Sequence, residues 1–207
     1  KELHYFTREY VPNYDPMLFG LEYYEQLRYD ATNGKLCGEA SPSYILAASR
    51  IAAFNPNAKI IIILRDPAAR ALSQYRQYRE HDLFFHMTSA IEDRPVESLN
   101  FVQDSLYEPA VSSFLQHFPP RQVMLVSFEE FCASQSDAMK HVFDFLGLAP
   151  MTIANARYSA SATIPAPKGF AAKLDDFFSS KRGRVAKLIQ EHHPVLYPDR
   201  PELFERY

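Results

Sequence analysis

The stretch KIIIILRDP, residues 59–67, decides how this chain folds. Its five consecutive apolar residues, four of them isoleucines, predict a strand buried on both faces, as in a parallel sheet. Arg65 closes the strand, and Asp66 is a candidate N-cap for a helix over residues 67–80, with Pro67 at its first position. The stretch therefore predicts a strand, a tight turn that carries a cation, and a helix.

The position of Arg65 allows two interpretations. In open α/β sheets, ligands bind at the carboxyl ends of the strands, and a cation beside a helix N-terminus favours an anionic ligand. The alternative is an arginine that forms a salt bridge at the end of a strand and binds nothing. This stretch by itself does not decide between them.

Strands and helices alternate along the rest of the chain. Two more strands are expected at residues 35–39 and 122–127, and more helices at residues 14–29, 43–54, 105–117 and 136–146 and in two stretches near the end. Residues 81–100 are polar and irregular. This alternation predicts an α/β three-layer sandwich around a central parallel sheet, in a single domain over residues 1–207. Three strands are few for such a sheet, so we expect that an N-terminal strand–loop–helix is missing.

Composition narrows the classes of function. The 22 basic and 25 acidic residues give a net charge of −3, which argues against nucleic acid as a partner, and no apolar run is long enough to cross a membrane. The seven histidines and two cysteines show no metal-ligand spacing. We expect Cys37 and Cys132 to be buried free thiols, which suits a reducing, cytoplasmic compartment.

Three features of the sequence coincide. Arg65 is followed eight residues later by Ser73, the chain opens with KELHYF at residues 1–6, and a late loop contains Lys168-Gly169-Phe170 followed by the basic stretch KRGR at residues 181–184. Together they resemble sulfotransferases that use 3′-phosphoadenosine 5′-phosphosulfate (PAPS). The resemblance is strongest to the heparan sulfate O- and N-sulfotransferases and their bacterial relatives. It also includes GEASPSY at residues 38–44 and SLY at residues 105–107.

The resemblance implies a P-loop-like sulfotransferase fold and a set of site residues. Arg65 and Ser73 would hold the 3′-phosphate of PAPS, and of its product adenosine 3′,5′-bisphosphate. A guanidinium and a hydroxyl suit that role because both donate hydrogen bonds to phosphate oxygens. The other residues implied to bind the cofactor are Tyr107, Lys168, Gly169 and Phe170. Glu2 would be the catalytic base, and His4 would orient the acceptor or share its proton.

The chain departs from the family pattern at several positions. Thr7 replaces a carboxylate, and Ala40 replaces a lysine that lies near the reacting groups in the heparan enzymes, which weakens the case for a heparan acceptor. The paired cysteines of the secreted branch are absent, which favours a cytoplasmic, bacterial-like member. The strand and the Gly- and Lys-containing turn that hold the 5′-phosphosulfate would belong to the missing upstream segment.

The sequence therefore predicts a sulfotransferase that moves a sulfuryl group from PAPS to a hydroxyl or amine of a small-molecule or carbohydrate acceptor. One alternative is a P-loop kinase-like phosphotransferase, which a GxxxxGK[ST] motif upstream would favour. The other is a sulfotransferase-like binding domain that has lost its chemistry, which the changes at Thr7 and Ala40 support.

Overall fold

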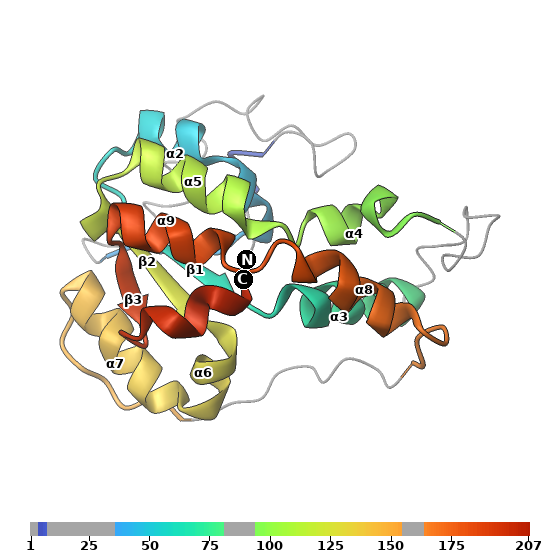
Figure 1. Cartoon of the computed structure of the whole chain (residues 1–207). Helices are drawn as coiled ribbons and strands as arrows, with labels where there is room; N and C mark the ends of the chain where they lie inside the picture. The colour runs from blue at the N-terminus through green and yellow to red at the C-terminus, as the bar shows by residue number, and fades with distance from the viewer. Residues whose placement is uncertain (1–3, 8–35, 81–93, 155–163) are drawn as a thin grey trace.

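The computed structural model describes residues 4–7, 36–80, 94–154 and 164–207 (Figure 1). Its sheet contains the strands β1 (Ile60–Leu64), β2 (Val123–Ser127) and β3 (Val195–Tyr197) in the order β1-β2-β3. Both pairings are parallel, with Leu64 opposite Ser127 at the carboxyl ends of the first two strands. The parallel sheet predicted from the sequence is confirmed.

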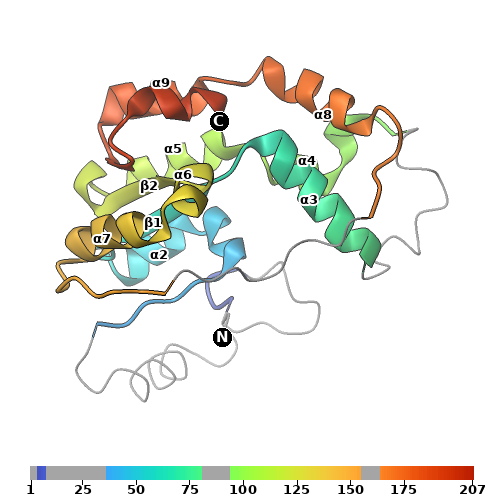
Figure 2. The same ribbon diagram turned by 90° about the horizontal axis from the view of Figure 1, so that it is seen from below.

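Helices cover both faces of this sheet, which makes the three layers visible in Figures 1 and 2. On one face lie α2 (Ala48–Phe54), α5 (Tyr107–His117) and α9 (Arg184–His192); on the other lie α6 (Phe128–Ala133) and α7 (Gln135–Leu146). Successive residues of β2 serve the two faces, since Leu125 packs into the first core and Met124 into the second. The predicted α/β sandwich is therefore the observed fold.

A second group of helices extends from the carboxyl end of β1. It comprises α3 (Pro67–Glu80), α4 (Asn100–Gln103) and α8 (Phe170–Ser179), which share a core of their own (Figure 2). The Phe170 ring lies 5.3 Å from the Tyr75 ring and 6.4 Å from that of Phe101. Short 3-10 helices complete the fold: η2 (Pro42–Leu46), η4 (Val96–Ser98), η5 (Pro120–Gln122) and η6 (Pro201–Arg206).

Most of the predicted elements are present, some with shifted ends. The helix over residues 67–80 is confirmed at both ends, and Gly147 ends α7 with a left-handed φ of 74°. The predicted helix over residues 43–54 is instead η2 and α2, separated at Ala47. The predicted helix over residues 14–29 and residues 81–93 lie outside the described residues.

Three expectations are wrong. Residues 36–39, part of the strand expected at 35–39, have no strand structure, and the third strand is instead β3, whose three residues are too short a run to stand out in the sequence. Strand β1 is fully buried on one face only: Ile62 and Leu64 are buried, whereas on the other face Ile61 packs partly buried against the core shared with α6 and α7 and Ile63 is 53% exposed. Cys37 and Cys132 are exposed free thiols.

The turn after β1 is stabilised by its own aspartate. The Ala69 N–H donates to Asp66 Oδ1 at 2.8 Å, so Asp66 is the N-cap that the sequence predicted. We expect Asp66→Ala to lower the free energy of unfolding by about 1 kcal/mol, because this N–H would lose its acceptor. Asp66→Asn keeps an acceptor oxygen and should cost much less. Urea unfolding of both variants measures the difference, and equal losses would contradict a capping role.

Candidate functional site

The site is built where the carboxyl ends of β1 and β2 meet. Arg65 directly follows β1 and is half-buried, with its guanidinium carbon 5.0 Å from the centroid of the Phe128 ring. Phe128 directly follows β2, and the pairing of Leu64 with Ser127 brings the two strand ends level. A guanidinium over an aromatic face is held by attraction to the ring while its N–H groups point outward around its edge.

The surroundings of the Arg65 guanidinium show whether it forms a salt bridge. Within the described residues, no carboxylate lies at salt-bridge distance from the Arg65 guanidinium. Its guanidinium lies over the neutral Phe128 ring, which does not compensate the positive charge. An arginine in this state at the end of a parallel strand favours the interpretation as an anion site.

The main chain around Arg65 is already engaged by protein acceptors. The Asp66 N–H donates to Glu129 Oε1 at 2.8 Å, and the Asp66 carboxylate takes the Ala69 N–H. The first turn of α3 therefore carries its own anionic cap, unlike a phosphate-binding loop whose N–H groups point at the ligand. An anion beside Arg65 would thus be held chiefly by side chains.

Two tyrosines line this region with neutral hydroxyls. Burial is the main cause that raises the pKa of Tyr107 to about 12, and the charge of Arg70 and a main-chain hydrogen bond from Arg65 oppose it. Burial and the hydrogen bond to Glu129 likewise raise the pKa of Tyr207. Tyr107 begins α5 and packs edge-on against Tyr207, with ring centroids 6.3 Å apart. Both hydroxyls are therefore protonated at neutral pH and can donate hydrogen bonds.

Ser73 and the late loop both belong to the helical group beside the sheet. Ser73 is half-buried in α3, while Gly169 adopts a φ of 79° at the start of α8, a conformation that suits glycine. Lys168 is exposed and Phe170 is buried against Tyr75. By helical periodicity Ser73 and Tyr75 lie on opposite faces of α3, so the packing of α8 does not by itself bring Lys168 to Ser73.

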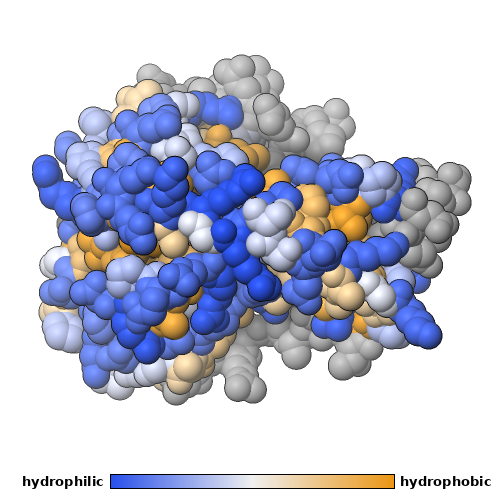
Figure 3. Space-filling model, in the orientation of Figure 1, coloured by the Kyte–Doolittle hydropathy of each residue, from blue (hydrophilic) through white to orange (hydrophobic). Residues whose placement is uncertain are grey.

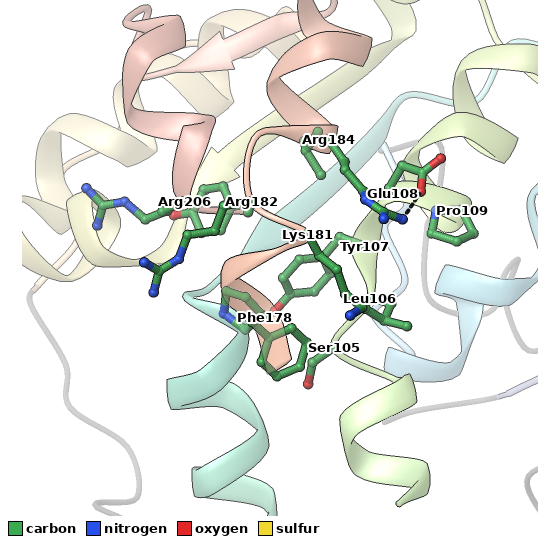
Figure 4. A pocket seen from close by; sticks show the side chains of 13 residues that line it. Ser105, Leu106, Tyr107, Glu108, Pro109, Phe178, Lys181, Arg182, Arg184 and Arg206 are labelled. Carbon is green, nitrogen blue, oxygen red and sulfur yellow. Dashed lines mark ion pairs between the residues drawn. The ribbon is translucent and has the colours of Figure 1, made fainter. Parts of the chain in front are cut away.

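A small pocket of about 60 Å³ lies next to the strand-end turn, between the starts of α3, α5 and α9 and the end of α8 (Figure 4). Its lining is mostly apolar and its rim is basic, with Lys181, Arg182, Arg184 and Arg206 around it. Arg184 pairs with Glu108 at 3.6 Å across the mouth. Tyr107 and the basic stretch at residues 181–184 therefore line the same pocket. Figure 3, in the orientation of Figure 1, shows strongly hydrophilic surface across the middle of the molecule.

The described catalytic candidate, His4, lies in a separate polar cluster beside η2. Its Nδ1 is 2.7 Å from Ser43 Oγ, and that oxygen is 2.6 Å from the buried Thr7 hydroxyl. Nearby, Tyr44 donates to Glu39 Oε1 at 2.6 Å. Thr7, where the resemblance expects a carboxylate, thus holds the histidine through neutral hydroxyls. Ala40 is exposed, and Glu2 lies outside the described residues.

Sequence reasoning missed three residues of this region. Glu129 lies in α6, Arg206 ends η6 and Tyr207 follows it. All three are far along the chain from Arg65, and only the fold brings them close to the strand-end turn. The FEEF stretch at residues 128–131 carried a signal, since a buried strand runs directly into it, but the signal did not show which glutamate faces Asp66.

The described residues contain neither a membrane-spanning helix nor a metal-binding cluster. They contain no helix that combines the length and the apolar character needed to cross a membrane. They also contain no group of three or more histidine, cysteine, aspartate or glutamate side chains arranged to hold a metal ion.

The fold and site define an α/β protein with a parallel sheet and, at the carboxyl end of a strand, an arginine that has no salt-bridge partner among the described residues. Comparison with known proteins identifies the family. The profile described as the sulfotransferase family matches residues 7–152, well over half of the sequence. The chain belongs to the sulfotransferase family.

Individual relatives agree with this assignment. Heparan sulfate glucosamine 3-O-sulfotransferase 3B1 from Homo sapiens is 31% identical over 159 residues, which are 71% of this chain and 38% of that protein. The bifunctional heparan sulfate N-deacetylase/N-sulfotransferase 3 from Mus musculus is 31% identical over 139 residues, 62% of this chain and 16% of the relative. The chain spans less than half the length of these relatives.

A solved structure shares the fold. The crystal structure of a sulfotransferase from Alicyclobacillus acidocaldarius superposes with a TM-score of 0.72 at 23% sequence identity. The superposition covers 96% of this chain and 85% of the Alicyclobacillus chain. The predicted P-loop-like sulfotransferase fold is therefore confirmed.

Proposed function

We propose that this protein transfers a sulfuryl group from PAPS to a hydroxyl or amine of an acceptor, within a single domain over residues 1–207. The observation that carries the proposal is the Arg65 guanidinium, held over Phe128 at the carboxyl end of β1 without a carboxylate partner among the described residues. Membership of the sulfotransferase family supplies the donor, because enzymes of this family are expected to use PAPS.

The residues present suit the 3′-phosphate end of PAPS. Arg65 supplies charge and fork-shaped donors, and Ser73 and Tyr107 supply neutral hydroxyls. Lys168, Gly169 and Phe170 are proposed to bind the same cofactor from the start of α8. When bound, PAPS supplies an activated sulfuryl group. Because Asp66 and Glu129 occupy nearby N–H groups, the phosphate would depend mainly on side chains.

The acceptor must lose a proton as the new S–O or S–N bond forms. We assign that proton to Glu2 as general base, with His4 as the group that orients the acceptor or shares the proton. The hydrogen bond between His4 Nδ1 and Ser43 Oγ orients the imidazole ring. Thr7 and Ser43 hold the ring without adding a charge beside it.

The acceptor class is proposed as a small molecule or a carbohydrate. The relatives named above carry heparan sulfate in their names, which supports a carbohydrate, whereas Ala40 stands where the heparan pattern has a lysine. The pocket rim carries the four cations Lys181, Arg182, Arg184 and Arg206, of which Arg182 and Arg184 pair with Asp175 and Glu108. The positive charge that remains suits an acceptor with anionic groups. We retain a cytoplasmic location as a proposal, since both cysteines are unpaired.

The test separates sulfuryl transfer from its two alternatives. The full-length protein is incubated with PAPS and panels of carbohydrate and small hydroxyl or amine acceptors, and release of adenosine 3′,5′-bisphosphate is measured. We expect acceptor-dependent release and no transfer from ATP with Mg²⁺. Phosphate transfer from ATP would indicate the kinase-like alternative. Binding of adenosine 3′,5′-bisphosphate without turnover on any acceptor would indicate a binding domain.

A further inference from the structure

The ends of β1 and β2 contact each other through two successive residues on each side. The Phe128 ring supports the Arg65 guanidinium, and Glu129 Oε1 accepts the Asp66 N–H at 2.8 Å. The Phe128 ring thus holds the Arg65 side chain, and the Glu129 carboxylate holds the main chain at Asp66. Together these contacts restrict both the backbone position from which the Arg65 side chain extends and the direction in which it points.

Glu129 is itself held from the opposite side. Its Oε2 accepts the Tyr207 hydroxyl at 2.6 Å, and the Tyr207 hydroxyl also lies 2.9 Å from the buried Ser127 Oγ. Burial alone would raise the pKa of Glu129, but the hydrogen bonds from Asp66 and Tyr207 outweigh it and lower that pKa. The carboxylate is therefore ionised at neutral pH and accepts hydrogen bonds from these two donors and, at 3.4 Å, from the Ser127 hydroxyl.

This arrangement explains how a carboxylate can lie so near Arg65 without neutralising it. Both oxygens of Glu129 are engaged by N–H and O–H donors, and the guanidinium lies over Phe128 instead. A glutamate that paired with Arg65 would compete with an incoming phosphate, whereas this one fixes the turn and leaves the guanidinium accessible.

We propose that Glu129 is a positioning residue for phosphate recognition, fixing the Arg65–Asp66 main chain while Phe128 supports the guanidinium. The inference rests on the proposed function, since the anion it serves is the 3′-phosphate of the cofactor. It assigns Tyr207, far from Arg65 in sequence, the role of holding Glu129 in place.

The experiment measures recognition of the 3′-phosphate separately from overall stability. The measured quantity is the dissociation constant for adenosine 5′-phosphate divided by that for adenosine 3′,5′-bisphosphate. Both constants are determined calorimetrically on the full-length protein. We expect Glu129→Ala to lower this ratio about tenfold, and Phe128→Leu about threefold, through loss of a hydrogen bond and of the cation–π contact respectively. Glu129→Gln, which keeps one acceptor oxygen for the Asp66 N–H, should restore most of the ratio.

Glu130→Ala is the matched control. Glu130 is the next residue of α6 and pairs with Arg200 at 3.1 Å, away from the strand-end turn. The Glu130→Ala substitution removes the same charge as Glu129→Ala and should leave the ratio of dissociation constants unchanged. In an Arg65→Ala background, Glu129→Ala should add less than a twofold further loss, because both changes act on one contact.

The outcomes distinguish the two proposals. A wild-type protein that binds both nucleotides equally would overturn the proposed function, and the positioning role with it. A wild-type preference for the 3′-phosphate that survives Glu129→Ala, even with a lower melting temperature, would overturn the positioning role alone. Fully additive losses in the double variant would also overturn it.

Discussion

Arg65→Ala is expected to weaken the binding of adenosine 3′,5′-bisphosphate by roughly 2–4 kcal/mol, the size of a lost bidentate, charge-assisted contact. This corresponds to about 30-fold to 1,000-fold in the dissociation constant. The effect should be large because the guanidinium follows β1 directly, is half-buried over Phe128, and has no carboxylate partner among the described residues that would compete with the phosphate.

A second ligand shows whether the loss belongs to the 3′-phosphate. Adenosine 5′-phosphosulfate lacks that group, so its affinity should change far less in the same variant. Arg79→Ala is the matched control, because Arg79 is an exposed arginine in the last turn of α3. Calorimetric titration measures all three proteins. Equal losses for the two ligands would show that Arg65 has a structural role only.

The largest expected effect on turnover concerns the proposed general base. Glu2→Gln should lower the rate of sulfuryl transfer by about two to four orders of magnitude while leaving PAPS affinity unchanged, because the amide cannot accept the acceptor's proton. Steady-state rates together with equilibrium binding of PAPS separate the two effects. Near-normal turnover in this variant would exclude Glu2 from the mechanism.

His4→Ala then decides the role of the histidine. If His4 shares the proton or orients the acceptor, the variant should lose turnover without losing PAPS affinity. His117→Ala is the control, since His117 is exposed in the last turn of α5. A His4→Ala enzyme with normal rates would reduce the cluster of His4, Ser43 and Thr7 to a structural role.

Much of the fold could be predicted because its signals are local. The KIIIILRDP stretch contains a run of isoleucines, a capping aspartate and a proline at the first helical position, and each acts within one or two turns of the chain. Strand β1, the helix α3 and the Asp66 cap accordingly follow the prediction. The short β3 could not be predicted, because three residues become a strand only beside β2.

The sequence by itself determined the layered α/β class, the family resemblance and the presence of a cation at the end of a strand. Only the tertiary structure decided what surrounds that cation. Phe128, Glu129 and Tyr207 reach the Arg65–Asp66 turn through the pairing of β1 with β2 and the position of η6. Helical and strand periodicities report which face of an element is apolar, but contacts between distant segments depend on how the elements pack.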